Sequence, residues 1–401
     1  MTKKRKLSWL TFVALGVGAI PAFVAALWVF MSVTSTPLHP NVQDITSVTR
    51  AEPAPRWSAA VEQSRTILRA ALAEQNIPGL SVAVGVGDDL VWAEGLGWAD
   101  LENRIQVEPE MRFRLGTASK AVTSAAVGLL LEQDRLKLDE EIQQYVPEFP
   151  KKQWPVTLRQ LLAHTAGLST DAGDEGPFGD HCERPVEGLK FMAEDALRFE
   201  PDTQYRYSTF GWILVSAAIE AVTREPFARF MKTQVLEPLG MHDTRLDSKT
   251  EEIPNRATFY FPRFAADNRY GMQFAPDVDY SCYAGSIGFL STPSDMVRFA
   301  IGMKRGTLLK PATVQLLQTS QRLRSGAETG YGLGWDLETA TVLGKPTPTI
   351  GYDGESIGGT VGSFLVFPEH GMTVALLTNT SWVDSFSLAV KIAEAFKATN
   401  K

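Results

Sequence analysis

The spacing of apolar residues divides the chain into a β-rich start, a mainly helical middle and a β-rich end. Between Trp57 and Ile77 apolar residues recur at helical spacing, and a Pro-Gly pair then ends the predicted helix. The stretch LSVAVGVGDDLVWAEGLGW, residues 80–98, predicts two strands around a Gly-Asp-Asp turn. Near the other end, residues 363–367 and 372–379 predict two more strands, and an amphipathic helix is expected at 385–398.

This order of elements predicts an α+β fold. The simplest packing joins the N-terminal and C-terminal strands into one antiparallel sheet flanked by helices, with the central helices as a second lobe. Residues 57–401 then form one domain. Its α/β part is expected at 57–140 and 300–401, and its mainly helical lobe at about 141–299.

The N-terminus carries an apolar run from Leu7 to Val33, preceded by four basic residues and followed by no charged residue before Asp44. A run of this length can cross a bilayer as a helix, and the basic flank favours an N-in orientation. The sequence therefore predicts a cytoplasmic tip and single-pass membrane anchor at 1–34 and a stem at 35–56. The domain would lie outside the cytoplasm, in the periplasm of a bacterium. The alternative is a cleaved signal peptide, whose apolar core is usually shorter.

Composition narrows the class of protein. The 401 residues carry a net charge of −7, with 44% hydrophobic and 21% charged residues, which are ordinary values for a globular protein. The acidic balance argues against a nucleic-acid partner. Only two cysteines occur, Cys182 and Cys282. Outside the cytoplasm they could form a disulfide, and two buried free thiols are the alternative.

The stretch RLGTASKAVTS, residues 114–124, places a hydroxyl and an amine at the start of an apolar helix. Thr117 lies at the helix N-terminus and Lys120 follows one turn later on the same face. Burial should lower the pKa of a lysine there, so that it could take a proton from the hydroxyl. The alternative is a capping threonine beside a lysine that reaches out to solvent.

Two further stretches could contribute to a site. Tyr207 precedes an apolar helix and could move protons near Lys120, or it could be an aromatic side chain packed at a helix start. Glycines crowd residues 351–362, where the backbone would allow a ligand to lie close. Ser356 in this segment fits G-x-S-x-G, but β sequence follows it where a nucleophile elbow needs a helix.

Metal and phosphate chemistry find no support in the sequence. The five histidines show no metal-ligand spacing, and His164 is expected to be structural at a helix end. No phosphate-binding glycine loop is present, and no cofactor is expected.

Taken in order, three of these stretches resemble the signature motifs of the serine β-lactamase and penicillin-binding-protein superfamily. That superfamily carries S-x-x-K, then Y-x-N, then K-T-G or H-x-G. The corresponding stretches here are Thr117-Ala118-Ser119-Lys120, Tyr207-Ser208-Thr209 and Tyr352-Asp353-Gly354. The neighbouring sequence is similar to the class C-like branch in FRLGTASK, LRQLLAHTAGL, YSTFGWIL, LEPLGMHDT, GSIGFLSTPSDMVRFA and YGLGW. The segment EIQQYVPEFPKK is similar to mitochondrial members of that branch, and the resemblance covers about residues 57–398.

The resemblance implies a β-lactamase/transpeptidase-like fold, with Thr117 rather than Ser119 at the nucleophile position. A threonine can act as a nucleophile, although its methyl group restricts χ1 and crowds the attack. Thr209 stands in place of the usual asparagine. Tyr352 stands in place of lysine or histidine, which removes a cation for a substrate carboxylate. These departures argue against classical turnover of β-lactams or D-Ala-D-Ala peptides.

The implied reaction is hydrolysis of an amide or ester through an acyl-enzyme. Lys120 and Tyr207 would deprotonate Thr117, and the backbone N–H groups of Thr117 and Glu355 would hold the oxyanion. Substrate binding would fall to the remaining motif residues, which are Thr209, Tyr352, Asp353 and Gly354. Expected substrates are small peptides, including D-amino-acid peptides, esters or β-lactam-like compounds.

The opposing interpretation is a non-catalytic, membrane-anchored binding or self-assembling protein on the same fold. Substitution at three motif positions is typical of relaxed catalysis, whereas a buried lysine is costly without a use. A homo-oligomer is compatible with both interpretations.

Overall fold

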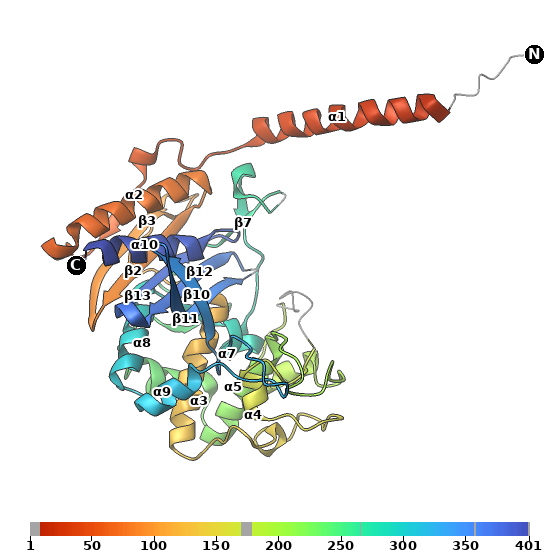
Figure 1. The fold of residues 1–401 in the computed structure, drawn as a ribbon, viewed down its shortest axis with the longest axis vertical. Coiled ribbons are helices and arrows are strands. Elements are labelled where there is room, and N and C mark those ends of the chain that lie inside the picture. Colours follow the sequence, from red (N-terminus) through yellow and green to blue (C-terminus); the bar gives the residue numbers. More distant parts are fainter. Residues whose placement is uncertain (1–8, 170–178, 265, 357, 400–401) are drawn as a thin grey trace, which may run out of the picture.

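One antiparallel sheet organises the computed structural model, which describes residues 9–169, 179–264, 266–356 and 358–399 (Figure 1). Its strands lie in the order β1–β3–β2–β13–β12–β11–β10, with β4 paired to β3. The bounds of these strands are β1 (Ser47–Thr49), β2 (Gly79–Val86), β3 (Asp89–Asp100), β4 (Ile105–Gln106), β10 (Asp336–Val342), β11 (Lys345–Ser356), β12 (Thr360–Phe367) and β13 (Met372–Thr378).

The two ends of the chain meet in the middle of this sheet. Strand β2 pairs with β13, and Ala83 lies opposite Ala375. Successive side chains of a strand point to opposite faces, so Val82 and Val84 enter one hydrophobic core and Ala83 enters the other. The α+β fold and the antiparallel sheet built from both termini are confirmed.

Helices cover both faces of the sheet, as Figure 1 shows. Helices α2 and α10 pack together on one face, and α8 packs against β2 and β13 on the other. Helices α3, α4, α5, α7 and α9 lie on the same side of the sheet as α8 and make up most of the second lobe. The helix bounds are α1 (Trp9–Thr34), α2 (Ser58–Glu74), α3 (Ser119–Glu132), α4 (Leu158–Leu162), α5 (Phe210–Thr223), α6 (Phe227–Phe230), α7 (Ala284–Ile287), α8 (Pro293–Arg305), α9 (Pro311–Leu317) and α10 (Ser385–Thr399).

Two small sheets accompany the helical lobe. In the first, the strand order is β5–β9–β6, and the second consists of β7 and β8. Their bounds are β5 (Phe113–Arg114), β6 (Arg245–Leu246), β7 (Tyr260–Pro262), β8 (Met272–Phe274) and β9 (Phe289–Ser291). The pairing of β5 with β9 matters most for function, because β5 leads directly into the segment that carries Thr117.

The segment expected to form a stem, residues 35–56, contributes to the domain. Strand β1 extends the sheet by pairing with β3, and the Ser47 hydroxyl donates a hydrogen bond to the fully buried Glu94. The side chain of His39 bonds the carbonyl of Ile77 at 2.8 Å.

Helix α1 extends away from this domain (Figure 1), and the described side chains from Ile20 to Phe30 are exposed. Within the part of the chain that the structure describes, no helix meets the combined length and apolar character of a membrane span. The predicted transmembrane anchor therefore has no support in the structure.

A disulfide joins Cys182 to Cys282, whose Cα atoms lie 4.9 Å apart. The bond closes a separation of 100 residues within the helical lobe and confirms the first of the two expectations for these cysteines.

Candidate active site

A sharp turn places Thr117 at the entrance of a buried helix. The amide of Leu115 bonds the carbonyl of Phe289 at 2.8 Å, and Gly116 then adopts a φ of +54°, a conformation that glycine allows at low cost. Residues Gly116–Ala118 form a single 3₁₀ turn before α3 begins. Thr117 is half-buried, whereas Lys120, on the first turn of α3, has no exposed surface.

The structure brings Lys120 and Tyr207 together. The Lys120 Nζ lies 4.8 Å from the centre of the Tyr207 ring, within the range of a cation–π contact. The same ammonium donates a long hydrogen bond, 3.4 Å, to the carbonyl of Ser286. The lysine points inward, so the alternative in which it reaches out to solvent is wrong.

Strand β11 passes directly against the Thr117 hydroxyl. A Cβ atom built on Gly354 would lie 2.0 Å from Thr117 Oγ1 and 3.6 Å from Thr117 N. Only a residue without a side chain fits at this contact. Strand β11 at Gly354 therefore lies beside the turn that leads into α3.

Two other hydroxyl groups are unsuited to act as the nucleophile. Ser119 has no exposed surface, and its Oγ accepts a hydrogen bond from the amide of Phe289 at 3.3 Å. Ser356 ends β11, and the next element is strand β12. The G-x-S-x-G match therefore lacks the strand-to-helix turn of a nucleophile elbow.

The expected substrate-binding residues separate into different environments. Tyr352 is 1% exposed and its hydroxyl is hydrogen-bonded to that of Tyr331. Asp353 accepts hydrogen bonds from the hydroxyls of Ser363 at 2.6 Å and Ser385 at 2.9 Å, so its carboxylate is directed toward α10. Thr209 is buried immediately before α5. Of the four expected residues, Gly354 is the one whose contact with Thr117 is defined.

His164 belongs to the same cluster, although its sequence context indicated only a structural role. Its Nδ1 accepts a hydrogen bond from the Ser208 amide at 3.1 Å, which leaves the ring proton on Nε2. The ring centre lies 4.2 Å from that of Tyr207. Burial, assisted by the positive charge of Lys120, lowers the pKa of His164 well below its ordinary value, so the imidazole is neutral. His164 thus fixes the position of Tyr207 without adding charge.

Tyr331 and Asp336 also belong to this cluster, although the sequence analysis did not single them out. The Tyr331 ring lies 4.7 Å from His164, and Asp336 starts β10 opposite Gly351, the residue before Tyr352. Burial, with smaller contributions from Glu338 and Asp353, raises the pKa of Asp336 to about 7, and the nearby charge of Lys120 opposes the rise. Tyr331 is the first residue of the landmark YGLGW and Asp336 follows its last, so this landmark was the available signal.

Comparison with known proteins identifies the family of this chain. The sequence pattern described as "Beta-lactamase" matches residues 65–395. The chain belongs to the beta-lactamase family. The human protein "Serine beta-lactamase-like protein LACTB, mitochondrial" is 27% identical, over 89% of this chain and 84% of its own length.

Solved structures of the family share the fold. The D-amino acid amidase of Ochrobactrum anthropi SV3, complexed with L-phenylalanine amide, superposes with a TM-score of 0.73 at 23% identity, covering 86% of this chain and 100% of the amidase. The octameric penicillin-binding protein homologue of Pyrococcus abyssi gives a TM-score of 0.69 at 24% identity, covering 84% and 76%. The match to the beta-lactamase pattern and to a serine beta-lactamase-like relative confirms the expected superfamily for this chain.

Proposed function

We propose that this protein hydrolyses an amide or ester bond through an acyl-enzyme formed on Thr117. The observation that carries the proposal is the confined position of the Thr117 hydroxyl. It lies against the bare backbone of Gly354, at the mouth of the helix whose first turn holds the buried Lys120 beside Tyr207. A nucleophile, a base and a proton carrier within one cluster are the parts that acyl transfer requires.

The reaction divides into balanced proton transfers. Lys120, in the fraction of molecules in which it has lost its proton, takes the hydroxyl proton of Thr117, and Oγ1 attacks the carbonyl carbon of the substrate. The backbone N–H groups of Thr117 and Glu355 hold the oxyanion, and loss of one such donor typically costs about 2.7–4 kcal/mol of barrier. Tyr207 passes its proton to the leaving amine or alcohol and recovers one from protonated Lys120. A water molecule then attacks the acyl carbon, its proton passes through Lys120 to Thr117 Oγ1, and the acid is released.

The residues around Thr117 favour substrates that carry no carboxylate at the position next to β11. Tyr352 occupies the position of the family's cation, and its buried hydroxyl is already bonded to Tyr331. Within the proposed range of small peptides, D-amino-acid peptides, esters and β-lactam-like compounds, we therefore expect uncharged esters and amino-acid amides to react best. The similarity to a D-amino acid amidase supports the amide class.

Covalent labelling tests the assignment. The protein is incubated with an activated ester or a fluorophosphonate, the intact mass is measured, and the modified peptide is mapped. One adduct on Thr117 is expected, retained in Thr117→Ser and Ser119→Ala and absent from Thr117→Ala. Lys120→Ala should slow acylation by several orders of magnitude, because the proton acceptor is gone. An adduct on Ser119 or Ser356 would contradict the mechanism.

A second candidate is a non-catalytic, self-assembling protein. The substituted motif positions favour it, and the octameric homologue supports assembly on this fold. Failure of the wild type to react, together with strong labelling of Thr117→Ser, would establish this alternative. Light scattering at several protein concentrations would give the oligomeric state under both proposals.

A further inference from the structure

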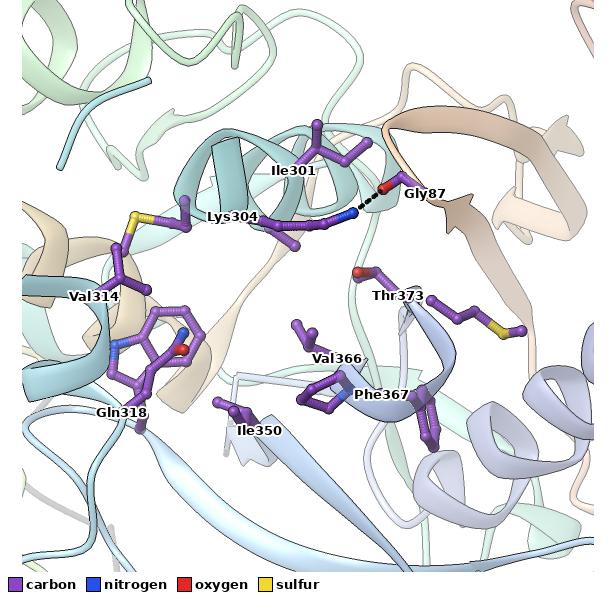
Figure 2. A pocket seen from close by; sticks show the side chains of 15 residues that line it. Gly87, Ile301, Lys304, Val314, Gln318, Ile350, Val366, Phe367 and Thr373 are labelled. Atoms are coloured by element: carbon purple, nitrogen blue, oxygen red, sulfur yellow. Dashed lines mark hydrogen bonds between the residues drawn. The ribbon is translucent and has the colours of Figure 1, made fainter. Parts of the chain in front are cut away.

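A cavity lies away from the catalytic cluster, between the sheet and residues of α8 and α9 (Figure 2). Its volume is about 250 Å³. The wall is mainly aliphatic and aromatic, with contributions from Ile301, Val314, Trp335, Ile350, Val366 and Met372. An engineered cavity of about 150 Å³ already holds a benzene molecule, so this one has room for a longer apolar group.

Few polar side chains line the described part of the cavity, and the charge that they carry is positive. Among the described residues that line it, Lys304 alone is charged, and Gln318 and Thr373 supply neutral polar side chains. Figure 2 shows the Lys304 chain lying along the cavity with its ammonium directed toward Gly87, whose carbonyl it bonds at 3.2 Å. The same ammonium lies 3.1 Å from the carboxylate of Asp88.

Asp88 is shared between two cations. Besides Lys304 it pairs with Arg305 at 3.7 Å, so a single carboxylate faces both a lysine and an arginine. The side chain of Lys304 is 57% exposed, which leaves its ammonium accessible to a further anion. An apolar cavity beside such a cation is complementary to an amphiphile with one negative end.

We propose that this cavity binds a medium-chain carboxylate, with the aliphatic chain against Ile301 and Val366 and the carboxylate on the Lys304 ammonium. The hydrophobic contribution should grow with chain length until the cavity is full, at about fourfold in affinity for each added methylene. The carboxylate should add affinity through its interaction with Lys304, and this part should weaken with salt.

The cavity shares its wall with the strand that serves the catalytic cluster, although it is a separate site. Ile350 and Tyr352 are two residues apart on β11 and therefore point to the same face of the sheet. Phe364, opposite Tyr352 on β12, has its ring centre 6.2 Å from that of Trp335. The proposal rests on the cavity itself and does not depend on the activity assigned to Thr117.

Calorimetric titration of the full-length protein tests the site, with butyrate, hexanoate, octanoate and octyltrimethylammonium below their micelle concentrations. Octanoate should bind once per chain, more tightly than hexanoate and butyrate, and at least tenfold more tightly than the cation of equal chain length. Lys304→Glu should weaken octanoate at least tenfold. Lys232→Glu, the same charge change on an exposed lysine outside the cavity, should leave the affinity unchanged.

Filling the cavity gives an independent arm of the test. Val314→Phe and Ile301→Phe each add volume inside the wall and should abolish octanoate binding, with melting temperatures showing that both variants fold. Absence of saturable octanoate binding to the folded wild type would overturn the proposal. So would equal affinity for the cationic amphiphile, or unchanged octanoate affinity in both folded filling variants.

Discussion

Replacing Gly354 by alanine tests how closely the structure holds the Thr117 hydroxyl. The added Cβ would lie 2.0 Å from Thr117 Oγ1, although Cβ contacts under 3.0 Å essentially do not occur. Either the hydroxyl or strand β11 must therefore move by about 1 Å. Threonine is branched at Cβ, which leaves it few alternative χ1 angles in which to avoid the methyl group.

The expected loss of activity in Gly354→Ala follows from this displacement of the Thr117 hydroxyl. A misplacement of about 1 Å at a reacting group can cost about 100-fold in rate. Overpacking of a well-filled site typically costs about 1–3 kcal/mol of folding free energy. A 100-fold loss in rate corresponds to about 2.7 kcal/mol of barrier, so Gly354→Ala should lose transition-state stabilisation and folding free energy in similar measure while remaining folded. Thr117→Ser in the Gly354→Ala background should recover part of the loss, because serine can rotate its hydroxyl away from the new methyl group.

The assay is kcat/KM for an activated ester, the rate of acylation by intact mass, and the melting temperature. Gly179→Ala is the matched control, since a Cβ there meets no atom within 4 Å. Wild-type kcat/KM in a folded Gly354→Ala protein would refute the assignment. The hydroxyl held against Gly354 would then not be the reacting group.

Three further predictions concern ionisation and stability. The folded protein keeps a proton on Asp336 up to about pH 7, whereas the unfolded chain releases it near pH 4. The stability that this proton provides is therefore lost as pH rises from about 4 to about 7, and the melting temperature of Asp336→Asn should fall less than that of the wild type over this range. Reduction of the Cys182–Cys282 disulfide should destabilise the protein, by up to about 4.7 kcal/mol for a loop of about 100 residues, and an unchanged denaturation midpoint under reductant would contradict this. Deletion of residues 1–34 should leave the melting temperature unchanged, whereas deletion of 1–52 removes β1 and its bond to a buried carboxylate and should lower stability by about 1–3 kcal/mol.

The sequence by itself determined the architecture. Alternating and continuous apolar runs identified β2, β3, β12 and β13, because a buried strand must present apolar side chains at regular spacing. The mainly apolar character of 118–132 predicted that α3 would be buried, whereas the sequence left open whether Lys120 is buried with it or reaches out to solvent. Local pattern also gave the Thr117–Lys120 pair, since one helical turn separates the two residues.

Tertiary structure decided which residues share the site. The glycine-rich segment 351–362 is a strand pair in which Gly354 is required by the approach of Thr117, from more than two hundred positions away. No local pattern reports such a contact. The spacing of residues along the sequence likewise could not show that the Asp353 carboxylate faces α10. Nor could it show that the neighbouring Tyr352 is buried against Tyr331.

The charged state of the site was also a product of the fold. Packing removes water from both His164 and Asp336, which makes the imidazole neutral and lets the carboxyl hold its proton toward pH 7. The nearby charge of Lys120 assists the first effect and opposes the second. Desolvation and charge proximity depend on segments brought together from the whole chain. The sequence therefore specified the elements and the Thr117–Lys120 pair, and the packing of distant segments determined which other residues surround that pair and how they are protonated.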